Sequence, residues 1–206
     1  MKLYLIRHGQ SDTNIKSVIS SPFGQLTKVG IKQSYLIAKI LKNIPIDIIL
    51  TSPYKRAKQT AKIISKQLNK NLIISNLLRE KKLPKEIEGK LKKDKYVKEI
   101  LNLLDNKNII NHKWHYSNEE NFIDTKKRTI KFLNYLKKIK QKNIVIIFHE
   151  YLIKMLLFIL KNKSKSKINY IQFKRFYNNF LVDNGSIIFC EISKNKISYS
   201  YFIVSK

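Results

Sequence analysis

Short apolar runs alternate along this chain with longer segments in which apolar residues recur at helical spacing. An alternation of strand and helix is typical of a mostly parallel sheet covered by helices on both faces. The last two apolar runs are separated only by a short turn at residues 193–195, which predicts a C-terminal hairpin. We therefore predict a three-layer α/β/α sandwich. Its strands are expected at residues 3–6, 46–50, 71–75, 144–148, 187–192 and 197–204.

Five segments of the chain carry the helical period. Thr27 is a plausible N-cap for the first, and Ser52 with Pro53 for the second, because a hydroxyl side chain caps a helix and proline suits its first position. The expected helices are 26–42, 53–68, 92–104, a segment from Glu119 or Glu120 to residue 139, and 151–160. At 206 residues we expect one domain, with residues 81–120 as an insertion that covers the active site.

Composition narrows the class of protein. The chain is 43% hydrophobic and is therefore expected to be globular, and no apolar run is long enough to cross a bilayer. Cys190 is the only cysteine, which favours a reducing, cytoplasmic location and excludes an intrachain disulfide. The net charge of +28 comes almost wholly from lysines spread over the chain, so we expect attraction of anionic substrates but no specific nucleic-acid site and no membrane partner.

Four basic side chains stand where the predicted fold would bring them together. Arg7 and His8 follow the first strand, His149 follows the strand at 144–148, and Arg56 lies in the first turn of the helix at 53–68. Ligands of open α/β sheets bind at the carboxyl ends of the strands, and a helix N-terminus attracts anions. Because a cation in the first helical turn is otherwise disfavoured, Arg56 points to a bound phosphate or carboxylate.

Metal ligands are not expected. His112 and His115 lie three residues apart, but no cysteine or further carboxylate stands at metal-ligand spacing around them. We interpret them as histidines of a polar loop and expect neither a metal nor another cofactor.

Several motifs resemble, in order, those of the histidine phosphatase superfamily, which includes the cofactor-dependent phosphoglycerate mutases. The segment 51–61, T-S-P-Y-K-R-A-K-Q-T-A, resembles S-P-x-x-R-A-x-Q-T-A and is the most specific. Residues 7–14, R-H-G-Q-S-D-T-N, are similar to R-H-G-[E/Q]-[S/T]-x-x-N, and residues 26–33 to L-T-x-x-G-x-x-Q. Leu78-Arg79-Glu80 with Glu88-Gly89 is similar to L-x-E … E-G, and Phe148-His149 to the second histidine. The motifs span nearly the whole chain, so the fold is expected to be phosphoglycerate mutase-like.

The resemblance implies a mechanism with phosphohistidine as its intermediate. His8 would attack phosphorus, and Glu80 would protonate the leaving oxygen and then activate water. The phosphate oxygens would be held by Arg7, Arg56 and His149, with Asn14 as a further donor. Guanidinium and imidazolium charge would take the place of a metal cation. For Glu80 this role requires a pKa raised by burial.

Two positions leave alternatives open. The surroundings of Glu80 are atypical, so Glu86 or Glu88 could supply the acid instead. Glu150 stands where the family usually has glycine, directly after the second histidine. A carboxylate there repels phosphate unless it points away and leaves only its backbone amide toward the ligand.

The expected activity is metal-independent phosphomonoester hydrolysis of the histidine acid phosphatase type, because the chain lacks the long insertions of the mutases. A cofactor-dependent phosphoglycerate mutase and a catalytically weak or inactive binder of phosphorylated ligands are the alternatives. The partner is expected to be a small phosphorylated substrate, whose identity and the oligomeric state do not follow from the sequence.

Overall fold

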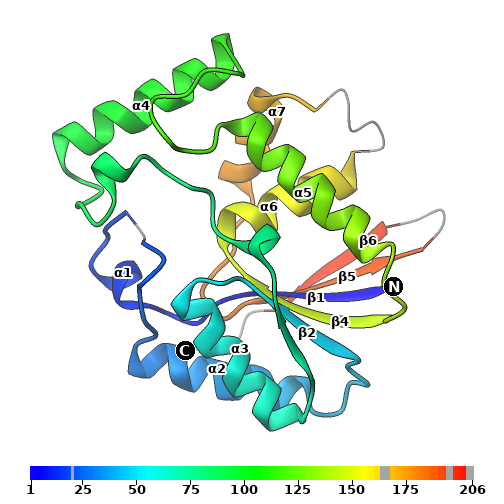
Figure 1. Ribbon diagram of the computed structural model, residues 1–206. Coiled ribbons are helices and arrows are strands. Elements are labelled where there is room, and N and C mark those ends of the chain that lie inside the picture. Colours follow the sequence, from blue (N-terminus) through cyan, green and yellow to red (C-terminus); the bar gives the residue numbers. More distant parts are fainter. Residues whose placement is uncertain (20, 163–167, 194–196, 203–206) are drawn as a thin grey trace.

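Six strands form one sheet in the order β3-β2-β4-β1-β5-β6 (Figure 1). The computed structural model describes residues 1–19, 21–162, 168–193 and 197–202. The first four strands of that order run parallel, whereas β5 pairs antiparallel with β1 and with β6. The strands are β1 (Lys2–Arg7), β2 (Ile48–Thr51), β3 (Leu72–Ile74), β4 (Asn143–Phe148), β5 (Ile187–Ile192) and β6 (Ile197–Phe202). The predicted mostly parallel sheet with a C-terminal hairpin is confirmed; the expected end of the last strand, residues 203–204, lies outside the described residues.

Helices cover both faces of the sheet, as expected for three layers (Figure 1). Side chains of one strand alternate between the faces. In β1, Leu3 and Leu5 pack in a core with α5, α6 and α7, while Tyr4 and Ile6 pack in a second core with α2 and α3. The bounds are α2 (Lys28–Leu41), α3 (Lys55–Leu68), α5 (Phe122–Leu136), α6 (Glu150–Lys161) and α7 (Tyr170–Asn179).

The helix boundaries follow capping residues. Thr27 caps α2 as predicted, and its hydroxyl accepts from the amide of Gly30 at 3.1 Å. The predicted start of the next helix was wrong: α3 begins at Lys55 with Tyr54 as its N-cap. The Ser52 hydroxyl accepts from the Tyr54 amide at 3.2 Å and also hydrogen-bonds with His149. Helix α7 was not predicted. Asn169 and Gln172 form a capping box at its start, and its Phe173 packs against aromatic side chains of α5 and α6.

Residues 81–120 lie over the carboxyl edge of the sheet together with the short helix α1 (Asp12–Ile15) (Figure 1). The segment contains the 3₁₀ turn η2 (Lys85–Ile87) and α4 (Lys95–Ile110). This helix begins later than the one expected at 92–104 because Asp94 caps it, and it also ends later. Ile87, Val97, Ile100 and Leu104 of this segment form a small separate core with Ile19. Another 3₁₀ turn, η1 (Asn76–Leu78), follows β3. Over the described ranges, no helix is long and apolar enough to span a membrane.

Candidate active site

The two histidines are placed by adjacent parallel strands. Arg7 pairs in register with Phe148, and the amide of His8 donates to the Phe148 carbonyl at 3.1 Å. His8 and His149 are therefore the first residues beyond β1 and β4. Their ring centroids lie 5.2 Å apart at the carboxyl edge of the sheet.

The hydrogen bonds of His8 define its tautomer. Nδ1 lies 2.8 Å from the Gly9 carbonyl, which can only accept, so Nδ1 carries the proton. Nε2 accepts from Nε–H of Arg56 at 2.9 Å, so its lone pair faces the arginine. Burial, then the charges of Arg56 and Arg7, holds the pKa of His8 well below its usual 6.5. The ring is thus neutral at pH 7 and keeps the lone pair that a nucleophile needs.

Arg56 links the two histidines from the first turn of α3. It is almost completely buried, and its other terminal nitrogens donate to the Ser21 carbonyl at 2.7 Å and to Nδ1 of His149 at 3.2 Å. Such contacts orient the guanidinium, whose planar donors suit phosphate oxygens. The predicted convergence of Arg56 with the strand-end histidines is what the structure shows.

His149 is neutral, unlike the imidazolium that the resemblance implied. Arg56 can only donate, so Nδ1 of His149 accepts and Nε2–H donates to the Ser52 hydroxyl at 2.8 Å. Burial, then the positive charge of Arg56, holds the pKa of His149 well below 6.5. A charged His149 therefore requires an anion in the site.

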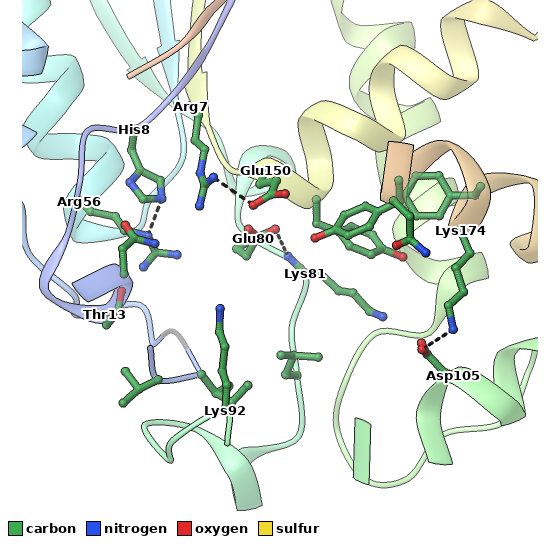
Figure 2. Close-up of a pocket in the computed structure, with 18 of the residues that line it drawn as sticks. Arg7, His8, Thr13, Arg56, Glu80, Lys81, Lys92, Asp105, Glu150 and Lys174 are labelled. Carbon is green, nitrogen blue, oxygen red and sulfur yellow. Dashed lines mark hydrogen bonds and ion pairs between the residues drawn. The ribbon is translucent and has the colours of Figure 1, made fainter. Parts of the chain in front are cut away.

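A carboxylate beside a phosphate site was expected to point away from it. The Glu150 side chain instead lies against the basic residues. Its Oε2 lies 3.0 Å from NH1 of Arg7, and its Oε1 lies 2.6 Å from Nζ of Lys154 one helical turn later. NH1 of Arg7 also donates to the Val182 carbonyl at 2.5 Å. Two cations thus neutralise the carboxylate, which is why it can lie at the edge of the site. Figure 2 shows its contact with Arg7.

Asn14 lies in the short helix α1 that follows the His8 loop, and it lines the same pocket. Its Oδ1 accepts from both the amide and the hydroxyl of Ser11, at 3.0 and 2.7 Å. Because the oxygen is engaged within the capping box, the amide Nδ2 is the end of this side chain that can donate to a ligand.

Among the three candidate acids, Glu80 lines the pocket with His8 and Arg7. Burial raises its pKa above the usual 4.5, and the negative charge of Glu150 acts in the same direction, against a backbone hydrogen bond from Lys81 and the charge of Arg56. Glu86 is exposed and accepts from the Ser117 hydroxyl, whereas Glu88 lies beside a neighbouring hollow. The geometry therefore favours Glu80.

A buried ion pair that the sequence did not reveal holds the chain on either side of Glu80. Glu120 and Arg128 form two hydrogen bonds of 2.7 Å. NH1 of Arg128 also donates to the Arg79 carbonyl at 2.8 Å, and Oε2 of Glu120 accepts from the Lys82 amide at 3.0 Å. The only sequence signal was that Glu120 stands near a helix start, which did not indicate this contact.

Several other residues of the sequence motifs hold the loop after His8 in place. A Cβ on Gly9 would lie 2.4 Å from the Gly30 carbonyl oxygen, so these two glycines allow the His8 loop to touch α2. The Thr60 hydroxyl accepts from the Gly9 amide at 3.1 Å, and Gln33 Oε1 accepts from the Gln10 amide at 2.8 Å. Asn184 donates to the His8 carbonyl at 3.1 Å, a contact that sequence reasoning missed.

A cavity of about 310 Å³ is lined by the side chains of Arg7, His8, Asn14, Arg56, Glu80 and Glu150, among others (Figure 2). Figure 2 shows Arg7, His8, Arg56, Glu80 and Glu150 around its inner end, and Asp105 with Lys174 at the opposite side. The far wall is formed by aromatic side chains of α6 and α7: Tyr151, Tyr170, Phe173 and Tyr177. The shape fits an anion at the inner end and a small organic group beyond it.

His112 and His115 lie outside this pocket. His112 hydrogen-bonds through Nδ1 with the Asn108 carbonyl, and Nε2 of His115 lies 2.7 Å from Oδ2 of Asp124. Within the part of the chain that the structure describes, no three histidine, cysteine or carboxylate side chains are grouped to hold a metal ion.

Comparison with known proteins agrees with this geometry. The sequence pattern of the histidine phosphatase superfamily (branch 1) matches residues 3–199. A provisionally named phosphoserine phosphatase 2 of Hydrogenobacter thermophilus is 34% identical over 154 residues, which are 72% of each chain. A 2,3-bisphosphoglycerate-dependent phosphoglycerate mutase of Thermoplasma acidophilum is 41% identical over 78 residues, 37% of this chain and 39% of that one.

A solved structure extends the likeness to the whole fold. The alpha-ribazole phosphatase of Shigella flexneri superposes with a TM-score of 0.80 at 21% identity, over 98% of this chain and 95% of that one. The strand-end histidines, the helix-start arginine and the match along nearly the entire sequence lead to one assignment. The chain belongs to the histidine phosphatase superfamily, branch 1.

Proposed function

We propose that this protein is a metal-independent phosphomonoesterase that works through a phosphohistidine on His8. The observation that carries this proposal is the state of His8: Nδ1 holds the proton, and the lone pair of Nε2 faces Arg56 inside the pocket. In-line phosphoryl transfer needs a positioned nucleophile and positive charge around the equatorial oxygens, and little else from the protein.

In the first step, the Nε–H of Arg56 leaves Nε2 of His8 for a phosphoryl oxygen, and the released lone pair of Nε2 attacks phosphorus while the bond to the leaving oxygen breaks. Arg7, Arg56, Asn14 and, once charged, His149 bind the phosphoryl oxygens. Glu80 gives its proton to the leaving oxygen, and the burial that raises its pKa keeps that proton available.

In the second step, the Glu80 carboxylate removes a proton from water, whose oxygen attacks the phosphohistidine. The P–N bond breaks, its electron pair returns to Nε2, and inorganic phosphate leaves. Because the pKa of His8 is low, the neutral ring is the state to which the enzyme returns.

The finer assignment to the acid-phosphatase type rests on the same two groups. The reaction needs neutral His8 and protonated Glu80 together, and the pKa of His8 lies well below its usual value while that of Glu80 is raised. Both shifts bring the two conditions together, and the lowered pKa of His8 extends their overlap toward acid pH.

Hydrolysis of an aryl phosphate in the presence of EDTA tests the proposal. We expect activity that EDTA does not reduce and that His8→Ala abolishes, with His115→Asn as a matched control at a surface histidine. A phosphate-donor pulse followed by an alkaline quench should label wild type and not His8→Ala. Unlabelled, inactive wild-type protein would instead favour a binder of phosphorylated ligands.

A phosphoglycerate mutase is the second candidate, supported by the mutase of Thermoplasma acidophilum among the relatives. The two activities differ in the acceptor of the phosphoryl group. Stimulation of the interconversion of 2- and 3-phosphoglycerate by 2,3-bisphosphoglycerate, faster than release of inorganic phosphate, would favour the mutase.

A further inference from the structure

The pocket contains more positive charge than one phosphate requires. Its acidic residues other than Glu80 already have partners: Glu150 lies against Arg7 and Lys154, and Asp105 lies 2.6 Å from Nζ of Lys174. The basic residues of the lining are Arg7, Arg56, Lys81, Lys92 and Lys174. A phosphate dianion beside His8 would balance Arg7 and Arg56 and leave the two remaining lysines, Lys81 and Lys92, without a counter-charge.

Lys81 is the more constrained of these two. Its ammonium lies 4.9 Å from the ring centroid of Tyr151, and across the described ranges no carboxylate lies within ion-pair distance of Nζ. The residue is partly buried, whereas Lys92 is exposed at the rim. Burial lowers the pKa of Lys81, against the attraction of Asp105 and other carboxylates at longer range. A partly buried ammonium of this kind gains most from an anion that enters the pocket.

The position of Lys81 relates it to the leaving group. It directly follows Glu80, and we propose that Glu80 protonates the leaving oxygen. The Lys81 side chain therefore begins on the leaving-group side of the bond that breaks. In Figure 2 the side chain extends away from Glu80, toward the end of the pocket where Asp105 and Lys174 pair. Asp105 contributes the largest attraction that Lys81 experiences, which agrees with this direction.

The wall beneath Lys81 keeps the ammonium in place. The Tyr151 ring packs edge-on against Phe173, with centroids 5.2 Å apart, and is tilted against Tyr177 at 5.6 Å. The face of an aromatic ring attracts a cation but leaves its N–H donors unsatisfied. The buried hydroxyl of Tyr151 also has no hydrogen-bond partner among the described residues. The Lys81 ammonium and the Tyr151 hydroxyl are therefore two polar groups of the pocket whose hydrogen bonds the described residues do not satisfy.

We propose that Lys81 binds a second anionic group, a carboxylate or a phosphate, on the alcohol part of the substrate. The inference rests on the proposed phosphomonoesterase function and narrows its substrates to phosphomonoesters whose leaving group is itself an anion. Lys81 is a specificity-determining residue here and takes no part in the transfer of the phosphoryl group.

Matched pairs of esters test the proposal. In 3-phosphoglycerate a carboxylate stands where glycerol 1-phosphate has a hydroxymethyl group. Propane-1,3-diol bisphosphate and its monophosphate form the equivalent pair for a second phosphate. For each pair, the ratio of kcat/KM for the anionic and the neutral ester gives the preference for a second anion and identifies its chemistry.

Substitutions of Lys81 and Lys82 distinguish a direct contact between Lys81 and the second anion from the general attraction of anions to this basic protein. Lys81→Met removes the ammonium, Lys81→Arg keeps the charge, and Lys82→Met removes the same charge from the next residue, which lines the neighbouring hollow instead. We expect wild type to prefer the anionic ester of at least one pair. Lys81→Met should lower that ratio about tenfold, the size of one lost hydrogen bond to a charged group, and Lys82→Met should change it less than twofold.

The outcomes decide between the alternatives. The proposal is overturned if Lys81→Met has the same kcat/KM ratio as wild type, or if Lys82→Met lowers this ratio as much as Lys81→Met does. In either case, hydrolysis of the neutral esters would still support the phosphomonoesterase. Retention of the ratio in Lys81→Arg supports it. If wild type hydrolyses none of the four esters, the aryl phosphate assay decides the proposed function, and calorimetric Kd values for the same pairs decide the role of Lys81.

Discussion

Oε2 of Glu150 lies 3.0 Å from NH1 of Arg7, so a carboxylate occupies one edge of the arginine that we assign to the phosphate. Oε1 of the same side chain lies 2.6 Å from the buried ammonium of Lys154. Glu150 thus holds Arg7 in place and neutralises Lys154, but it also repels an approaching phosphate dianion. Replacing Glu150 with a neutral residue should therefore raise the affinity for phosphate and lower the stability of the protein.

For Glu150→Gln we expect the Ki of inorganic phosphate as a competitive inhibitor to fall several-fold, since one negative charge beside the site is removed. The free energy of unfolding should fall by about 1–3 kcal/mol, because Lys154 keeps only a neutral acceptor. Inhibition kinetics and urea unfolding measure the two effects. The double variant Glu150→Gln with Lys154→Met is the control and should regain part of the stability; a rise in Ki would show that Glu150 supports phosphate binding.

The pH dependence of kcat/KM should follow Glu80 and His8. Activity rises with pH as His8 loses its proton, well below pH 6.5, and falls as Glu80 loses its own, above 4.5. In Glu80→Gln the alkaline fall should disappear and the loss of rate should be greater for an alkyl than for a nitrophenyl ester, because a good leaving group needs less protonation. An unchanged alkaline limb would assign that ionisation to another group.

Arg128→Lys should reduce catalysis although Arg128 does not line the pocket. Lysine lacks the planar fork that holds Glu120 together with the carbonyls of Leu77 and Arg79, so Glu80 loses its fixed position. We expect kcat for an alkyl phosphate to fall about tenfold or more and kcat for an aryl phosphate to fall less. The exposed Arg175 provides the control through Arg175→Lys. Equal losses on both esters would indicate a general loss of structure.

Stability should also depend on pH through His8 and His149. The pKa of each is lowered in the folded state, so the unfolded chain binds more protons below about pH 6.5. The free energy of unfolding should therefore rise with pH between about 5 and 7, by at most about 2.7 kcal/mol per pH unit for two protons. Urea unfolding at several pH values should show a smaller rise of the unfolding free energy with pH for His8→Asn and for His149→Asn than for wild type.

The sequence predicted the sheet and the meeting of His8, Arg56 and His149 because both depend on short-range patterns. An apolar run marks each strand, and the first residues after parallel strands share one edge. Helix α7 was missed although Asn169 and Gln172 form a capping box at its start and Tyr170, Phe173 and Tyr177 recur at helical spacing. In the folded protein it packs on α6.

The charge state of the site was harder to predict, since it depends on distant residues. The orientation of Glu150 follows from Arg7 and Lys154 together, and the neutrality of His149 follows from burial beside Arg56. Glu120 precedes Asn121, the N-cap of α5, and Arg128 lies within that helix, but their contacts with the chain around Glu80 exist only in the folded protein.

The parallel pairing of Arg7 with Phe148 has a consequence for how this site can change. Because His8 and His149 are each the next residue, their separation is fixed by backbone hydrogen bonds and not by side chains. A slip of one residue between β1 and β4 would turn every apolar side chain of one strand to the opposite face. The hydrophobic cores therefore protect the spacing of the two histidines, and the many surface lysines can be exchanged without moving either ring.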